Sequence, residues 1–421
     1  MIAISERKPS GVSRLYAEYR TLLWVCLLIF TSQIGFGSIV PVVPLYAQAF
    51  GVPQSAIGLT IGIFGLARFL LSVPSGNVAD TLGRRWVLAM GGLLTVGGNL
   101  LSGLADGYVS FLVARFVAGC GASFIITGCQ IVLADISTPE KRGRMMSVYQ
   151  GTFMFAVGSG PYPGGLLAES FGLSAPFFAN AILGAAVSAL AWFAVPETRG
   201  MRAGRVVSVT AKPPPFIDQL RIMSGQSGFM LISLVSFMNT FARTGALFNL
   251  IPILGKDRLG LTTDQIGLSL SAVSVFGLLM AYPSGWLSDR YGRKRIIVPS
   301  ATVMGLAFLV FPVAPSFGWF MVGCMTWSLA TGTGGAAQPS YAADVVPPGM
   351  NAAAMSSFRA LADMGYVAGP ILLGLVADVA GVNAALYATS VMVLGSTALF
   401  AVRAKETHRR SAATPSGRTP A

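Results

Sequence analysis

The chain has 421 residues, of which 53% are hydrophobic and only 11% charged, and its mean hydropathy is +0.67. This composition excludes an ordinary soluble globular domain and predicts an integral membrane protein. The formal net charge of +13 would suit a nucleic-acid-binding protein, but the positions of the basic residues argue for a bilayer instead.

Twelve apolar stretches each approach the length of about 20 residues that a helix needs to cross a bilayer. A basic tail, residues 1–21, precedes the N-terminal half, residues 22–195, whose predicted spans lie at 22–46, 56–79, 86–105, 109–133, 146–168 and 174–195. A basic, proline-containing linker at 196–226 leads to the C-terminal half, residues 227–403, with spans at 229–254, 263–287, 296–314, 317–342, 353–378 and 383–403. A charged tail follows at 404–421.

The two halves carry the same short motif between their second and third spans. It reads GNVADTLGRRWVL in the first half and GWLSDRYGRKRII in the second, 209 residues further along. The same offset pairs Asp135 with Asp344, and Gly160-Pro161 with Gly369-Pro370. So long a gap-free register indicates two copies of one unit. The predicted fold class is therefore an all-α membrane protein of 12 transmembrane helices in two pseudo-symmetric six-helix halves.

Basic residues gather on one side of the predicted spans. If both termini are cytoplasmic, most of the 29 Lys and Arg residues fall on the cytoplasmic side, and only Lys256 and Arg258 fall on the opposite side. This asymmetry fits the positive-inside rule. We therefore expect a multi-pass protein of a bacterial inner (plasma) membrane with both termini cytoplasmic, in contact with lipid and with no nucleic acid.

Two six-span halves joined by a basic loop, with this motif in each, resemble the major facilitator superfamily over nearly the whole chain. In that family the motif is a conformational latch between helices that separate when the transporter switches. The matching residues are Gly76, Asp80, Gly83, Arg84 and Arg85, and Gly285, Asp289, Gly292, Arg293 and Lys294. The glycines would let helices approach closely, and the aspartates would accept hydrogen bonds from an arginine or a helix N-terminus. A purely topogenic basic loop would not need them in matched copies.

Three further segments resemble the 12-span drug:proton antiporter branch of that family. The first span carries Gly35, Pro41 and Pro44, and the fourth carries an RxxxGxG motif at Arg115, which the family links to proton handling. The fifth carries a GPxxGG motif associated with exporters, formed by Gly160, Pro161, Gly164 and Gly165. Ala156 stands where the pattern has a glycine, and Cys324 stands where an equivalent second-half arginine would fall. Ordinary helix packing is the alternative for these Gly and Pro residues.

Ionisable side chains inside a membrane cost about 2.5–3.5 kcal/mol each on insertion scales, so they usually face a cavity or a bundle interior. Asp363 is the only acid well inside a span, and it lies one helical turn after Arg359. It is either a proton carrier or half of a self-contained Arg359–Asp363 pair that braces the inner gate. The proton-coupling or gating candidates are Asp363, Arg359, Arg115 and Asp135. The arginines could instead cap carbonyls or reach the surface, and Asp135 could cap a loop.

The predicted membrane core leans positive, because no acid lies in the first span and the arginines outnumber Asp363. We therefore expect a neutral, zwitterionic or anionic substrate rather than a lipophilic cation. The substrate-cavity candidates are Arg68, Arg243, Gln33, Asn239, Asn249 and Gln150. Further polar and aromatic candidates are Gln130, Tyr366, Phe36, Phe153 and Phe241.

These features predict a secondary active transporter that exports a small amphipathic or drug-like molecule in exchange for protons by alternating access. An importer or uniporter of a small organic solute on the same scaffold is the nearest alternative, and a membrane sensor that binds without transport is another. The sequence has no GxxxxGK[ST], HExxH or GxSxG motif, so we expect neither an enzyme nor an ATP-driven pump. We expect a working monomer with no cofactor and no metal.

Overall fold

The computed structural model describes residues 11–137, 139–199, 225–346 and 351–407. Parts of the predicted tails, 1–10 and 408–421, and most of the predicted linker, 200–224, lie outside the described residues. Within the described part the chain is helical and contains no strand, which confirms the predicted all-α class. Ten helical segments there are long and apolar enough to cross a membrane.

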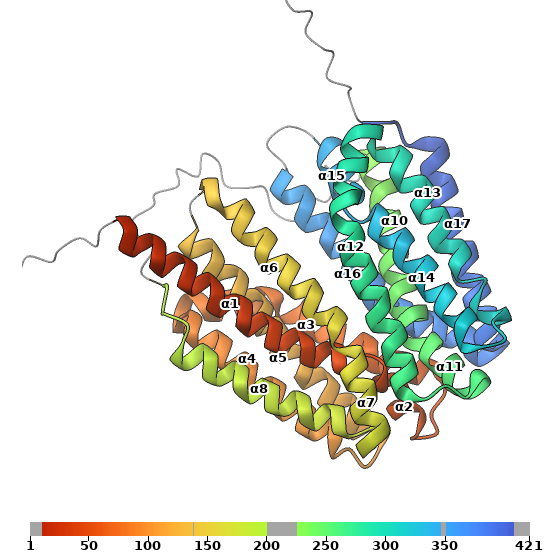
Figure 1. Cartoon of the computed structure of the whole chain (residues 1–421), viewed down its shortest axis with the longest axis horizontal. Helices are drawn as coiled ribbons and strands as arrows, with labels where there is room; N and C mark the ends of the chain where they lie inside the picture. Colours follow the sequence, from red (N-terminus) through yellow and green to blue (C-terminus); the bar gives the residue numbers. More distant parts are fainter. Residues whose placement is uncertain (1–10, 138, 200–224, 347–350, 408–421) are drawn as a thin grey trace, which may run out of the picture.

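The helices form two bundles that lean against each other (Figure 1). The N-terminal half contains α1 (Gly11–Ile39), α2 (Val42–Gln48), α3 (Gln54–Leu82), α4 (Arg84–Gly103), α5 (Tyr108–Ile136), α6 (Pro139–Ser159), α7 (Pro161–Phe171) and α8 (Ala175–Phe193). The C-terminal half contains α10 (Ser227–Ala242), the π-helix η2 (Arg243–Leu250), α11 (Ile251–Leu259), α12 (Thr263–Tyr291), α13 (Arg293–Ala307), η3 (Phe311–Val313), α14 (Phe317–Gly334), α15 (Ala337–Asp344), α16 (Asn351–Ala380) and α17 (Val382–Arg403).

Five predicted spans depart from one regular helix. In the ninth, α13 ends at Ala307 and the span finishes in the 3₁₀-helix η3. The first is divided between α1 and α2 next to Pro41, and the fifth between α6 and α7 at Gly160, ahead of Pro161. Proline lacks the N–H group that a continuous helix would use, so a break at these positions is expected. The tenth span is divided between α14 and α15, and the seventh passes through η2. The fifth and tenth predicted crossings are therefore missing from the ten long segments.

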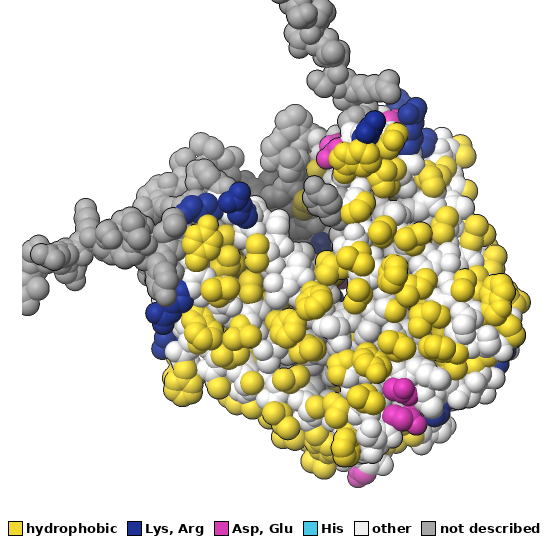
Figure 2. All heavy atoms as spheres, viewed as in Figure 1, with side chains coloured by type: hydrophobic (Ala, Val, Ile, Leu, Met, Phe, Trp, Pro, Cys, Tyr) yellow, Lys and Arg dark blue, Asp and Glu magenta, His cyan; other side chains and the backbone are white. Residues whose placement is uncertain are grey.

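Large apolar side chains cover the outside of both halves (Figure 2). Val379, Phe193 and Val402 are each more than four-fifths exposed, which suits lipid rather than water. Lys and Arg side chains gather at the end of each half where α3 meets α4 and α12 meets α13. We call this the basic end, and we call the opposite end, which carries the α4–α5 and α13–α14 connections, the far end.

The two halves meet mainly through two matching helix pairs, α3 with α16 and α7 with α12, and α12 also contacts α6. A Cβ atom on Gly58 of α3 would lie 1.9 Å from the carbonyl oxygen of Pro370 on α16. A Cβ atom on Gly267 of α12 would lie 2.3 Å from that of Pro161 on α7. Only glycine permits so close a backbone approach, and both contacts lie toward the far end. The halves are thus in close contact at the far end, whereas the two bundles diverge toward the basic end (Figure 1).

Candidate functional site

A cavity of about 290 Å³ lies between the two halves and is lined by side chains from both. α1 and α3 supply Gln33, Phe36, Phe64 and Arg68 on one side. η2 and α16 supply Arg243, Phe248, Arg359, Asp363 and Tyr366 on the other. The Phe36 and Phe64 rings stack with their centroids 5.2 Å apart. The cavity therefore combines an aromatic wall with a cluster of charges, a combination that suits a small amphipathic ligand.

Asp363 pairs across the cavity with the opposite half. Its Oδ1 lies 3.4 Å from Nη2 of Arg68, and the two side chains are 32% and 25% exposed. The Arg68 guanidinium also lies over the Tyr366 ring, 5.0 Å from its centroid. The self-contained Arg359–Asp363 pair considered above is wrong for this structure, because Asp363 points to α3 rather than along its own helix. Arg359 lines the cavity as a separate, exposed cation.

Arg243 lines the cavity at the point where α10 gives way to the π-helix. Its Nε atom is buried and has no hydrogen-bond partner among the described residues. Nearby, Gly245 packs against the backbone of Gly369, where a Cβ atom would lie 2.6 Å from the carbonyl carbon. A buried guanidinium N–H group without a partner is costly, so the site is suited to a ligand that brings an acceptor.

Arg115 does not line the main cavity. It is 2% exposed and lies over the Phe64 ring, 4.7 Å from its centroid. Its Nε and Nη1 atoms have no hydrogen-bond partner among the described residues, and the side chain borders a separate cavity of about 20 Å³ beside Tyr366. A space of that size holds about one water molecule. Arg115 is therefore placed behind the aromatic wall rather than in contact with a ligand.

Of the predicted polar lining residues, Gln33, Gln130 and Gln150 border the cavity, and Asn239 and Asn249 do not. Asn249 is fully buried, and neither polar atom of its side chain has a partner among the described residues. Of the aromatic candidates, Phe36, Phe153 and Tyr366 border the cavity, whereas Phe241 is buried elsewhere.

Sequence reasoning missed Asn99 and Asn180, which also border the cavity. Asn180 of α8 donates a hydrogen bond of 3.1 Å from its Nδ2 to Oδ1 of Asn99 on α4. The backbone of Gly35 lies against this amide, since a Cβ atom there would be 2.0 Å from Oδ1 of Asn180. The first-span motif glycine thus makes room for a polar pair. The presence of two asparagines inside predicted apolar spans could have indicated this Asn99–Asn180 pair from the sequence.

The GPxxGG motif places α7 between α1 of its own half and α12 of the other. A Cβ atom on Gly164 would lie 1.9 Å from the carbonyl oxygen of Ser38 on α1. One on Gly165 would lie 2.4 Å from that of Thr263 on α12. Packing this tight cannot accept a larger residue without moving a helix. The motif therefore belongs to the contact between the halves and not to the cavity lining.

At the basic end of the N-terminal half, Arg84 is the centre of a buried network. Its Nε lies 2.7 Å from Oδ2 of Asp135, and its Nη1 lies 3.0 Å from Oδ1 of Asp80. Glu197, just after α8, accepts hydrogen bonds from the backbone N–H groups of Arg84 and Arg85, at 3.0 and 3.1 Å. Asp135 thus binds an arginine rather than capping a loop, and all of these partners lie within one half.

Glu197 caps the first turn of α4 and lies outside the membrane spans. Partial burial by itself raises the pKa of its carboxyl group. The N–H groups of Arg84, Arg85 and Arg199 and the charge of Arg84 outweigh this effect and hold the pKa below its ordinary value of 4.5. Gly83 precedes this turn at φ 107°, a backbone conformation that strains any residue with a Cβ atom, and a Cβ atom there would also displace the Glu197 carboxylate.

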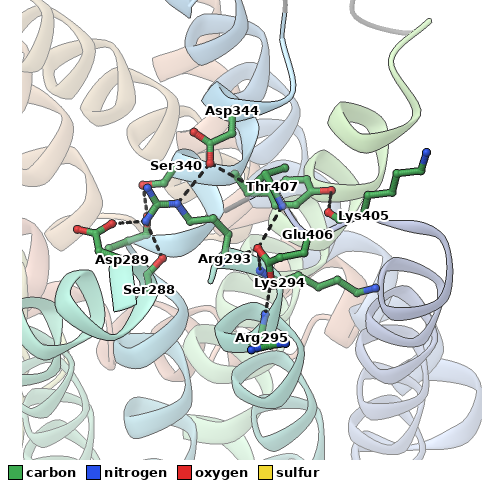
Figure 3. A network of polar contacts seen from close by, with 12 residues as sticks. Ser288, Asp289, Arg293, Lys294, Arg295, Ser340, Asp344, Lys405, Glu406 and Thr407 are labelled. Carbon is green, nitrogen blue, oxygen red and sulfur yellow. Dashed lines mark hydrogen bonds and ion pairs between the residues drawn. The ribbon is translucent and has the colours of Figure 1, made fainter. Parts of the chain in front are cut away.

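The C-terminal half repeats this network (Figure 3). Arg293 contacts Asp289, and its Nε lies 3.4 Å from Oδ2 of Asp344. Glu406 accepts the backbone N–H of Arg293 at 2.9 Å, as Glu197 does for Arg84. Glu197 and Glu406 were missed by sequence reasoning, although they stand at the same offset as the motif.

The expected close helix approach at Gly76 and Gly285 is wrong for this structure. A Cβ atom at either position would meet nothing within 4 Å. Both glycines face open space, because the two halves are apart at the basic end in this conformation.

The chain is thus a multi-pass membrane protein in which two repeats of six spans enclose a charged cavity, and this is the architecture of a solute transporter. The family model described as Major Facilitator Superfamily matches residues 25–263 and 229–421. The chain belongs to that superfamily.

Named relatives place it near the drug-resistance branch that the motifs resemble. It is 26% identical over 394 residues to the multidrug resistance protein MdtG of Yersinia enterocolitica, covering 89% of this chain and 91% of that protein. It is 27% identical over 352 residues to the class C tetracycline resistance protein of Escherichia coli, covering 81% and 85%. The solved structure of the nucleoside transporter NupG superposes with a TM-score of 0.74 at 13% identity, covering 91% and 97%.

Proposed function

We propose that the protein exports small amphipathic molecules from bacterial cells in exchange for protons. In this proposal the basic end faces the cytoplasm, as the positive-inside rule favours, and the structure represents the inward-facing state of an alternating-access cycle. The protein works as a monomer, since one chain contributes both halves of the cavity.

The observation that carries the proposal is the pair between Asp363 of α16 and Arg68 of α3, at 3.4 Å. It joins the two halves within the cavity, so any event that breaks it changes how the halves are held together. A proton that neutralises Asp363 breaks it, and so does a ligand that enters between the two side chains. Proton and ligand therefore act on the same contact.

Antiport requires that substrate and proton occupy this site in turn rather than together. A substrate that donates a hydrogen bond to ionised Asp363 competes with a proton for the same oxygen atoms. A simple anion would instead bind Arg68 and leave Asp363 free to take up a proton, so that both would travel in the same direction. Proton-driven export therefore favours a molecule with a donor group for Asp363 and an acceptor or anionic group for Arg68 and Arg243.

Such a substrate is neutral, zwitterionic or anionic overall, as the positive balance of the cavity favours. Arg243 offers an Nε–H group without a partner among the described residues, and the stacked Phe36 and Phe64 rings offer an apolar platform. Arg115, held behind Phe64, supports the position of that wall without contacting the ligand.

The rival function is import of a small organic solute on the same scaffold. The same fold occurs in a nucleoside transporter, so the fold does not determine the substrate. Two observations favour export. The GPxxGG motif is intact at Gly160–Gly165, and curated relatives are named for multidrug and tetracycline resistance.

The test is accumulation of three labelled probes in efflux-deficient Escherichia coli expressing the protein. Tetracycline is zwitterionic near neutral pH, benzoate is a simple anion and ethidium is a lipophilic cation. We expect the protein to lower the accumulation of tetracycline and to export neither benzoate nor ethidium. This lowering of tetracycline accumulation should be lost with a protonophore and in Asp363→Asn. Asp106→Asn, the same acid-to-amide change at a far-end residue outside the cavity, is the matched control and should retain the activity. Raised accumulation would make the protein an importer, and export of ethidium alone would refute the charge argument.

A further inference from the structure

The far end is closed by carboxylates that reach from one half to the other. Asp378, at the end of α16, accepts hydrogen bonds from the backbone N–H groups of Gln54 and Ser55, at 2.5 and 3.0 Å. Glu169, at the end of α7, accepts one from the backbone N–H of Thr263, at 2.9 Å. Gln54 and Thr263 are the first residues of α3 and α12. Each carboxylate therefore caps a helix that belongs to the opposite half.

Helix N-termini need such acceptors. The first N–H groups of a helix have no partner within it, and its dipole attracts a negative charge there. The residue before α3 is Pro53, which provides no side-chain hydrogen bond to the helix. Asp378 thus supplies a cap that the N-terminal half does not provide for itself.

The two contacts are copies of each other under the internal repeat. Glu169 and Asp378 stand at the offset of 209 residues, and so do Gln54 and Thr263. A third contact joins Nε2 of Gln48 to Oδ2 of Asp257 at 2.7 Å, and these two residues are themselves separated by 209 positions. The Gln48–Asp257 contact is its own copy under the repeat, so the pseudo-two-fold axis passes through it at the far end.

The backbone holds the acids in register at these positions. A Cβ atom on Gly374, one turn before Asp378, would lie 2.6 Å from the carbonyl oxygen of Gln54. Gly165, one turn before Glu169, has the equivalent contact with Thr263 at 2.4 Å. Each glycine lets its helix lie directly on the start of the partner helix. The carboxylate that follows one turn later then reaches the free N–H groups.

We propose that Glu169 and Asp378 are gating residues that hold the far end shut in the state seen here. Alternating access, on which this inference rests, requires the far ends to part, and parting breaks all three contacts. Both carboxylates are exposed, and Glu169 borders a surface cavity of about 450 Å³ together with Gln48 and Asp257. The contacts can therefore exchange with water without leaving a buried charge. Contacts of this kind are strong enough to favour one state and weak enough to be broken in every cycle.

The test measures the far end directly, without substrate or proton gradient. Leu104 and Val313 are exposed residues of the far-end connections, one in each half and themselves related by the repeat. Spin labels on cysteines at these two sites, with the four native cysteines replaced, report the distance between the halves by double electron–electron resonance in nanodiscs. The wild type should be dominated by one short distance.

Asp378→Ala and Glu169→Ala should each raise the ratio of open to closed far ends about three- to tenfold, and the double variant should multiply the two effects. Asp106→Asn is the matched control, because Asp106 is a far-end acid that accepts a hydrogen bond within its own half, from Ser110. It should leave the distances unchanged.

The conservative variants keep the proposal falsifiable if an alanine variant fails to fold. Glu169→Gln keeps the one acceptor that Thr263 uses and should resemble the wild type. Asp378→Asn loses one of two acceptors and should open partially. Unchanged distances in the folded double variant, or equal effects of Asp106→Asn, would overturn the proposal. Because no transport is measured, this result is separate from the outcome of the efflux experiment.

Discussion

The two ends of the molecule use the same chemistry for opposite purposes. At the basic end, Glu197 caps α4 from the end of its own half, and Glu406 does the same for α13. At the far end, Glu169 and Asp378 cap helices of the other half. A carboxylate on a helix N-terminus thus holds one half together in the first case and joins the two halves in the second.

The capping carboxylates are exposed at both ends, but the basic end adds a buried ion pair that the described residues of the far end do not match. The Arg84 and Asp135 side chains are 3% and 0% exposed, whereas both acids that join the halves at the far end are exposed to solvent. A contact inside one half need not break during transport, so it can be buried and strong. A contact between halves must break in each cycle, and exposure limits its energy. Substitutions at the basic end should therefore affect stability, and those at the far end should affect conformation.

The largest expected effect follows from Arg84→Ala. It leaves Asp135 as a buried carboxylate without its arginine, which typically costs about 3–5 kcal/mol. We expect a comparable loss in the free energy of unfolding, measured by denaturant titration in detergent micelles. Stability within about 1 kcal/mol of the wild type would contradict the assignment of this network to the folding of one half.

Arg293→Ala tests the equivalent arginine–aspartate pair of the C-terminal half, which is more exposed to solvent. Arg293 and Asp344 are 18% and 36% exposed, and their closest atoms are 3.4 Å apart. Water can therefore replace much of the lost interaction, and we expect a loss of about 1–2 kcal/mol in the same titration. A loss of unfolding free energy as large as that of Arg84→Ala would show that the difference in burial does not make the two networks contribute differently to stability.

Glu197→Gln should destabilise the protein by about 1 kcal/mol at neutral pH, since the exposed carboxylate caps α4. The folded-state pKa of Glu197 lies below its ordinary value of 4.5, so its contribution is present above pH 4.5 and is lost as the pH falls through the lowered pKa. Unfolding measured from pH 7 to pH 3 should show the difference between the two proteins shrinking toward zero in acid. A difference that grows in acid would contradict the cap.

The smallest effect on stability is expected from Asp378→Ala, because its carboxylate joins the halves rather than folding one of them. We expect less than about 1 kcal/mol in the unfolding titration, although the same substitution should open the far end. If it instead destabilises the protein as much as Arg84→Ala, the two ends would not have the different roles assigned to them.

The fold was predictable because its signals are long and repeated. Twelve apolar stretches and the offset that pairs Gly76 with Gly285 were enough to indicate two six-helix halves. Individual contacts of the site were less accessible. Asp363 was found as the only acid inside a span, but its partner Arg68 lies 295 residues away, and helical spacing suggested Arg359 instead. Asn249 also illustrates the limit, since a π-helix changes which face of the span points inward.

The far-end acids show a signal that was present and unused. Glu169 and Asp378 occupy matched positions in the repeat, and each stands one turn after a motif glycine or its counterpart. Taken singly, an acid outside the apolar core is typical of an ordinary surface residue. Its role as a cap depends on which helix N-terminus lies opposite, and only the packing of the two halves determines that.

The most direct test of the proposed function is the pH dependence of substrate binding to purified protein. The affinity for tetracycline should be measured between pH 5 and pH 8 for the wild type and Asp363→Asn. If substrate and proton compete for Asp363, wild-type affinity weakens on acidification, and this weakening is absent from the variant. Affinity that strengthens in acid, in the wild type alone, would mean that proton and substrate bind together and would contradict export by antiport.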